Sequence, residues 1–86
     1  MPKVSIIMSV YNGEKFLKEA VDSILGQTFK DFEFIIIDDG SKDSSKSIIE
    51  SYSDSRINLI SRENKGLTPS LNEGLKLARG KYIARM

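Results

Sequence analysis

The sequence predicts an α/β fold in which four β-strands alternate with three α-helices around a parallel sheet. Two observations carry this prediction. Short, nearly continuous apolar runs recur along the 86 residues, and the segments between them hold apolar residues at helical spacing. Strands without polar alternation are typical of a sheet that is covered on both faces, as parallel sheets are. Helices between successive strands supply the crossovers that parallel pairing needs. We therefore expect one domain of order βαβαβαβ.

The first half of the chain predicts two strands with a helix between them. Residues 4–10 are nearly all apolar and β-branched, so the first strand is expected there. The apolar residues from Phe16 to Leu25 form one helical stripe, with Asn12 or Gly13 as the expected N-cap. Residues 32–38 repeat the character of the first strand. A turn is expected at residues 39–41.

The second half predicts two helices and two further strands. A short helix is expected at residues 44–53, capped by Ser41 or Asp43, followed by a strand at residues 57–60. A loop then leads to a helix that begins with Thr68 as its cap and Pro69 at its first position. Gly80 is expected to end that helix with a positive φ. A fourth strand begins at residue 81.

Composition excludes several classes of protein. The chain has 13 Lys and Arg against 12 Asp and Glu, a net charge of +1, which argues against a nucleic-acid partner bound through net charge alone. It has no Cys and no His, which excludes disulfides, Cys-ligated zinc and the commonest general base. No apolar run approaches the roughly 18 residues of a membrane span, and no secretory signal is apparent. We expect a cytoplasmic domain without a membrane span.

The end of the sequence falls inside the fourth predicted strand, with no turn or cap after it. We therefore expect residues 1–86 to be the N-terminal part of a longer domain, truncated after its fourth strand. Open strand edges and uncovered apolar surface favour association, so we expect the fragment to form a dimer.

A ligand site is expected where two polar segments follow apolar strands. Ligands of open α/β sheets bind beyond the carboxyl ends of the strands, and residues 9–12 and 38–41 lie at two such ends. A carboxylate in the second segment suits a ligand that offers N–H groups or vicinal hydroxyls, Tyr11 suits stacking on a base, and Gly40 permits a close turn. The simpler alternative is that Asp38 and Asp39 only turn the chain. Neither a P-loop nor a GxGxxG motif is present.

Five linked segments resemble the start of a family 2 glycosyltransferase. They are SIIMSVYNGEKFL at 5–17, SILGQTF at 23–29, FIIIDDGSKDSS at 34–45, ENKG at 63–66 and LNEGLKLARGKYIARM at 71–86. The resemblance covers the whole chain in order. It implies the GT-A fold, which is Rossmann-like, with a sheet that begins in the order 3-2-1-4. It also implies a nucleotide-diphosphate-sugar donor, inversion at the sugar and a role in polysaccharide biosynthesis.

The resemblance also implies roles for individual residues. Tyr11 is expected to pack on the base, Ser9 to line the same pocket and Asp39 to bond the base. A carboxylate accepts a proton from uracil N3 but is repelled by cytosine N3, so a UDP-sugar is the expected partner. Asp38 is expected to support the pocket from behind. The full set of expected nucleotide-binding residues is Ser9, Tyr11, Asn12, Asp38, Asp39, Gly40, Ser41, Asn64 and Gly66.

Some parts of the family pattern differ or are missing. Ser9 stands where many members have Pro or Thr, and Leu71 stands where many have Arg. The metal-binding DxD motif and the catalytic base of the family lie beyond these 86 residues. We therefore expect no catalytic residue and no metal ligand in this chain, and Mn²⁺ or Mg²⁺ in the full-length enzyme. Two alternatives are a receiver-like signalling domain and a non-catalytic oligomeric α/β module.

Overall fold

The computed structural model describes residues 2–27, 30–64 and 66–85. Its sheet has four strands, all parallel, in the order β3-β2-β1-β4. The predicted fold class and strand order are therefore confirmed. The elements in chain order are β1 (Val4–Val10), α1 (Glu14–Leu25), β2 (Phe32–Asp39), α2 (Ser45–Glu50), β3 (Ile57–Arg62), α3 (Leu67–Leu77) and β4 (Tyr82–Arg85).

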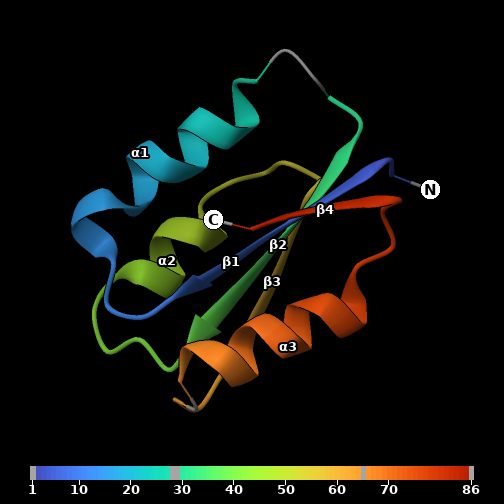
Figure 1. The fold of residues 1–86 in the computed structure, drawn as a ribbon. Coiled ribbons are helices and arrows are strands. Elements are labelled where there is room, and N and C mark those ends of the chain that lie inside the picture. The colour runs from blue at the N-terminus through green and yellow to red at the C-terminus, as the bar shows by residue number, and fades with distance from the viewer. Residues whose placement is uncertain (1, 28–29, 65, 86) are drawn as a thin grey trace.

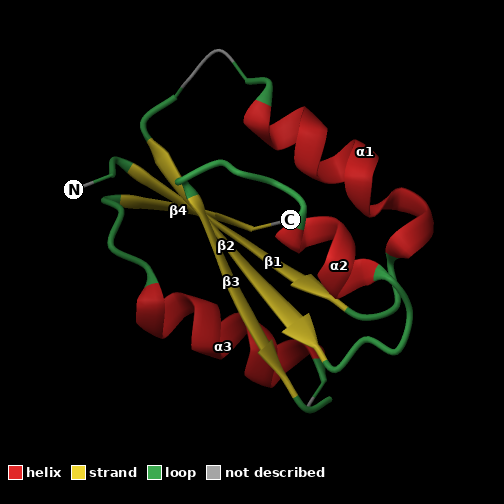
Figure 2. Cartoon of the chain, turned by 180° about the vertical axis from the view of Figure 1, so that it is seen from behind, coloured by secondary structure: helices red, strands yellow, loops and turns green. Residues whose placement is uncertain are grey.

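Three layers make up the molecule, with the sheet in the middle. Helices α1 and α2 lie together on one face of the sheet and α3 lies on the other (Figures 1 and 2). Alternate residues of β1 and β2 point to opposite faces, so the strands must be apolar on both sides. Every residue of β2 is buried. The main core lies between the sheet and α1 with α2, and it is built from Ile6, Met8, Val10, Leu17, Val21, Ile24, Phe32, Phe34, Ile36 and Ile49.

The opposite face of the sheet brings α3 very close to β1. A Cβ atom at Gly74 would lie 2.5 Å from the Ile7 side chain, so the glycine allows the helix backbone to approach the strand. Ser70, one turn earlier in α3, is fully buried.

Within the residues that the structure describes, no helix is long and apolar enough to cross a membrane.

The two ends of α3 differ from the sequence prediction. The helix begins at Leu67 with Gly66 as its N-cap at φ 94°, so Thr68 is not the cap and Pro69 occupies the third position. The helix ends with Ala78 as its C-cap, at φ −65° and ψ 132°. Gly80 does not have the positive φ that was predicted. Glycine is required there by a close contact instead, because a Cβ atom at this position would lie 2.5 Å from the backbone N of Ser5.

The remaining boundaries shift by a few residues. Strand β2 continues through Asp39, which was predicted to lie in the turn, and β3 continues to Arg62. Helix α2 is shorter than predicted and ends at Glu50. Ser44 is the N-cap position of α2, so neither Ser41 nor Asp43 holds it, although Asp43 Oδ1 accepts the Ser45 N–H at 2.9 Å. Gly13 is the N-cap position of α1.

Candidate functional site

The first turn of the candidate site is held by Asp38 at the end of β2. The Asp38 side chain is 2% exposed. Its Oδ1 accepts the Ser41 N–H at 3.1 Å, and its Oδ2 accepts the Ser61 hydroxyl at 3.2 Å. A carboxylate that accepts a backbone N–H three residues later is a common way to fix a turn. Asp38 therefore ties the turn at residues 39–41 to its own strand and to β3.

Asp39 joins the same turn to the loop that precedes α3. Its carboxylate is 3% exposed, and Oδ2 accepts the Gly66 N–H at 2.9 Å. Gly40 has φ 74°, and a Cβ atom there would lie 2.6 Å from the backbone N of Asn64. Both the dihedral angle and the close approach require glycine at this position. Asp39 and Gly40 are thus packed against Asn64 and Gly66, which lie far along the sequence.

Asn12 connects the end of β1 to the turn after β2. Its backbone N–H donates to the Ser41 hydroxyl at 2.9 Å, and its own Oδ1 accepts the Lys42 N–H at 2.8 Å. Asn12 has φ 52°, a left-handed conformation that Asn adopts more readily than most residues. This pair of bonds fixes the position of residues 11–13 relative to residues 40–42.

The start of α1 is bonded to the segment that leads into α2. The Gly13 N–H donates to the Ser45 hydroxyl at 2.9 Å, and the Glu14 N–H donates to Asp43 Oδ2 at 3.2 Å. Hydrogen bonds from the Ser45 side chain, and with smaller effect from the Ser45 and Glu14 backbone, hold the pKa of Asp43 below its usual range. Side chains of the 41–45 segment thus cap the first turn of α1 from outside the helix, since Gly13 has no side chain to do so.

Tyr11 and Ser9 complete the set of predicted residues. Tyr11 follows β1 directly and its side chain is 51% exposed, so the ring lies on the surface beside the loops described above. Ser9 is half-buried near the end of β1, paired in register with Ile37. The structure therefore brings Asn12, Asp38, Asp39, Gly40, Ser41, Asn64 and Gly66 into one bonded or packed cluster, and Tyr11 and Ser9 lie on the adjoining strand end.

The acidic pair does not have the arrangement of a metal site. Asp38 and Asp39 each accept hydrogen bonds from the protein, and they belong to successive positions of one strand, so their side chains point to opposite faces. Among the described residues, no three His, Cys, Asp or Glu side chains gather where they could hold a metal ion. The Asp38–Asp39 pair therefore does not supply the several converging oxygens that a divalent ion prefers.

The sequence prediction missed four polar residues at this edge of the sheet. Ser61 and Arg62 end β3, and Ser70 and Glu73 lie on the facing side of α3. The Arg62 side chain is 11% exposed and lies between Asp39 and Glu73, with Nη2 3.5 Å from Asp39 Oδ1. The one signal in the sequence was the charged residue that ends β3.

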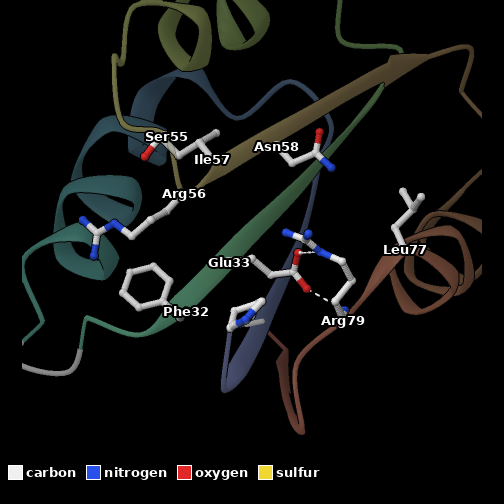
Figure 3. Close-up of a pocket in the computed structure, with 9 residues that line it drawn as sticks. Phe32, Glu33, Ser55, Arg56, Ile57, Asn58, Leu77 and Arg79 are labelled. Carbon is white, nitrogen blue, oxygen red and sulfur yellow. Dashed lines mark hydrogen bonds and ion pairs between the residues drawn. The ribbon is translucent and has the colours of Figure 1, made fainter.

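A pocket of about 610 Å³ lies at the opposite edge of the sheet, around the beginnings of β2 and β3 and the end of α3 (Figure 3). Its charged side chains are paired within the protein. Glu33 accepts the Arg79 N–H at 2.6 Å and the Arg79 Nε–H at 3.2 Å. Arg56 stacks on Phe32, 4.5 Å from the ring centroid. It also donates to Asp54 through Nε and Nη2, which lowers the pKa of Asp54 to about 2. This pocket lies at the amino ends of the strands, where ligands of such sheets rarely bind.

Comparisons with known proteins agree with the geometry. The family model for glycosyl transferase family 2 matches residues 5–86. An uncharacterized glycosyltransferase of Rickettsia prowazekii is 47% identical over 83 residues, which cover 96% of this chain and 26% of the relative. The uncharacterized glycosyltransferase EpsJ of Bacillus subtilis is 47% identical over 85 residues, which cover 96% of this chain and 25% of that protein.

Solved structures show the same likeness. The mannosyltransferase PcManGT of Pyrobaculum calidifontis, in complex with GDP-Man and Mn²⁺, superposes with a TM-score of 0.86 at 27% identity, over 95% of this chain and 26% of that one. The S. aureus TarS 1–349 structure in complex with UDP superposes with a TM-score of 0.84 at 31% identity, over 98% of this chain and 26% of that one. The chain thus spans about a quarter of the length of these relatives. On the family match and these likenesses, the chain belongs to glycosyltransferase family 2.

Proposed function

We propose that this chain is the N-terminal, nucleotide-binding part of a glycosyltransferase domain, and that the whole domain transfers a sugar from a UDP-sugar to an acceptor hydroxyl. The observation that carries the proposal is the meeting of three loop segments at the carboxyl ends of β1, β2 and β3: residues 9–12, residues 38–41, and Asn64 with Gly66. Open α/β sheets bind ligands at this edge. The bonds among the loops give the site a fixed shape before a ligand arrives.

The proposed recognition of the base uses two side chains. The exposed ring of Tyr11 stacks on the face of the base, as aromatic side chains do in many nucleotide sites. The Asp39 carboxylate accepts the N3–H of uracil. Cytosine presents a lone pair at N3, which a carboxylate repels, and guanine presents a donor at N1. The UDP and GDP-Man complexes of the two structural relatives support a site that selects bases with an N–H at that edge.

The other residues of the cluster form the walls of the proposed site. Asn12 and Ser41 hold the Tyr11 loop against the turn after β2. Asp38 holds that turn from behind, and Gly40 allows Asn64 to pack on it. Gly66, through its N–H, fixes one oxygen of Asp39. Loss of any of these contacts is expected to weaken binding through the shape of the site rather than through direct contact.

Titration of UDP into the chain, followed by NMR or calorimetry, tests the assignment. Asp39→Asn and Tyr11→Ala are the test variants, and Glu50→Gln, on the exposed side of α2, is the control. A hydrogen bond to a charged group contributes about 1.5–3 kcal/mol, so Asp39→Asn should lower the affinity for UDP roughly 10- to 100-fold. Equal affinity of both variants and the parent would show that the base binds elsewhere.

The proposal assigns binding to these residues and no chemical step. The Mn²⁺ complex of the Pyrobaculum relative makes a divalent metal plausible for the family, but the described residues of this chain do not offer a site for one. We therefore propose that the 86-residue chain binds nucleotide without transferring sugar.

Self-association of the chain is a further part of the proposal. Among the residues that the structure describes, strand β4 pairs with β1 alone and ends the sheet. Tyr82 and Ile83 on this strand are 55% and 51% exposed, and Leu75 and Leu77 on α3 are also exposed. An unpaired strand edge beside exposed apolar side chains favours pairing with a second copy. A non-catalytic oligomeric module would also form such a dimer. Nucleotide titration separates this alternative from the main proposal, because only the main proposal expects UDP to bind.

A further inference from the structure

Arg62 belongs to a closed ring of contacts that includes the proposed base-binding carboxylate. Its Nη2 lies 3.5 Å from Asp39 Oδ1 and donates to the Ser70 hydroxyl. The Ser70 hydroxyl donates to the Gly66 carbonyl at 2.9 Å, and the Gly66 N–H donates to Asp39 Oδ2 at 2.9 Å. The ring therefore runs from Asp39 through Arg62, Ser70 and Gly66 back to Asp39. Each oxygen of the carboxylate faces a different member of it.

The local fold places Arg62 for this role. Arg62 and Asp39 are register partners at the last positions of β3 and β2, so their backbones are fixed side by side. Ser70 is fully buried, and Arg62 and Asp39 are almost so. In such surroundings a charge interaction is screened far less than on the surface. The orientation of the Asp39 carboxylate is therefore determined by the ring rather than by solvent.

Glu73 holds the guanidinium from its other side. Arg62 Nε lies 3.1 Å from Glu73 Oε2, an ion pair that lacks the angles of a hydrogen bond. The Glu73 contact is shorter than the one with Asp39, so Arg62 is shared between two carboxylates. A carboxylate offers about four acceptor positions, so it can accept from several donors at once. Arg62 orients Asp39 at a distance longer than an ordinary hydrogen bond.

From this arrangement we infer that Arg62 is a positioning residue, which fixes the Asp39 carboxylate so that the site prefers a base with an N–H over one with a lone pair. The inference rests on the proposed function, because it assumes that Asp39 meets the base. It adds a residue outside the three loops as a determinant of base selectivity. Arg62 itself does not contact the nucleotide and acts through Asp39.

The planar fork of arginine is needed for the role. Arg62 places Nε 3.1 Å from Glu73 Oε2 and Nη2 next to Asp39 and Ser70, so two different nitrogens of one guanidinium meet the three partners. A lysine has one ammonium group, which cannot reach the same three partners in that geometry. Arg62→Lys therefore keeps the charge and loses the ring, whereas Arg62→Met removes both.

The test measures the ratio of UDP to CDP affinity for the parent chain, Arg62→Lys, Arg62→Met and Asp39→Asn. The control is Arg56→Lys, at the opposite edge of the sheet. We expect both Arg62 variants to lower the affinity for UDP roughly tenfold and the affinity for CDP by less than about twofold. The ratio of the two affinities therefore falls. A general loss of stability would lower the affinities for UDP and CDP by the same factor. The Arg62→Met, Asp39→Asn double variant should lose no more selectivity than Asp39→Asn alone, because the two residues act as a unit.

The outcomes separate this inference from the proposed function. One outcome is that the parent prefers UDP, that Asp39→Asn abolishes this preference, and that both Arg62 variants keep it. In that case the positioning role of Arg62 is wrong and the assignment of the base site to Asp39 stands. If the parent does not distinguish UDP from CDP, or binds neither, both are wrong. NMR spectra of each variant report whether it folds, and Arg62→Lys supplies the measurement if Arg62→Met does not fold.

Discussion

The buried carboxylate of Glu33 should contribute measurably to the stability of this fold. Glu33 is 7% exposed and lies near the start of β2. It accepts the Ser5 hydroxyl at 2.5 Å, the Arg79 N–H at 2.6 Å and the Arg79 Nε–H at 3.2 Å. These bonds connect β1, β2 and the segment that leads from α3 to β4. Glu33→Gln keeps the size of the side chain and removes its charge.

The expected cost follows from the three donors. A hydrogen bond to a charged group contributes about 1.5–3 kcal/mol, and a buried donor left unpaired costs about 1–3 kcal/mol. Glutamine keeps one acceptor oxygen but turns an NH₂ group toward at least one of these donors. We expect Glu33→Gln to lower the free energy of unfolding by about 2–4 kcal/mol. A domain of this size has about 4–13 kcal/mol in total.

The effect should depend on pH in a defined direction. Burial by itself raises the pKa of Glu33, but the hydrogen bonds from Ser5 and Arg79 outweigh it, so the pKa in the folded chain lies below its usual value. A carboxyl whose pKa falls on folding stabilises the fold above its unfolded pKa of about 4.3 and loses that contribution as the pH falls through the folded value. The difference between parent and Glu33→Gln should therefore be full at pH 7 and shrink below pH 4.

Urea unfolding followed by circular dichroism measures this difference at several pH values. Glu50→Gln, which removes an exposed carboxylate on α2, is the matched control and should change stability by less than about 0.5 kcal/mol. A Glu33→Gln chain as stable as the parent at pH 7 would refute the reasoning. A deficit that stays constant from pH 7 to pH 3 would show that the mismatched hydrogen-bond donor, and not the lost charge, is responsible.

Three further predictions concern packing, association and activity. Gly80→Ala should cost about 1–3 kcal/mol, because its Cβ would lie 2.5 Å from the Ser5 backbone; an unchanged urea midpoint would contradict this. Light scattering should give a mass that rises with concentration above the 9.6 kDa of one chain, and a constant 9.6 kDa would argue against the dimer. The purified chain should not hydrolyse UDP-sugars with or without Mn²⁺, so metal-dependent turnover would overturn that part of the proposal.

The strands and their order could be predicted because they depend on local patterns. Residues 4–10 and 32–38 are apolar on both faces, and only a covered parallel sheet accommodates two such runs joined by a helix. The roles of the glycines could not be predicted in the same way. A glycine satisfies either a positive φ or a close contact, and the second depends on residues that are distant in sequence. Gly66 needs the first and Gly80 the second, the reverse of what position alone suggested for Gly80.

The candidate site was accessible to sequence reasoning only in part. Residues 9–12 and 38–41 follow apolar strands directly, so their meeting at one edge follows from parallel pairing. The contacts of Arg62 do not follow from any local signal. Its partner Asp39 lies on the neighbouring strand, and Ser70 and Glu73 face it only after α3 has crossed to the other side of the sheet. Polar networks across three elements depend on tertiary packing.

The pairing of β1 with β4 determines the order in which this fold can assemble. The Tyr82 N–H donates to the Lys3 carbonyl at 3.0 Å, so the first and last strands lie side by side although nearly the whole chain separates them (Figure 1). Contacts between such distant segments form late, because the loss of chain entropy precedes the gain from contact. During synthesis, β1 therefore keeps one backbone edge unpaired until β4 has emerged. That interval is when the nascent chain is most exposed to aggregation, and when a chaperone that binds extended apolar segments would act on residues 4–10.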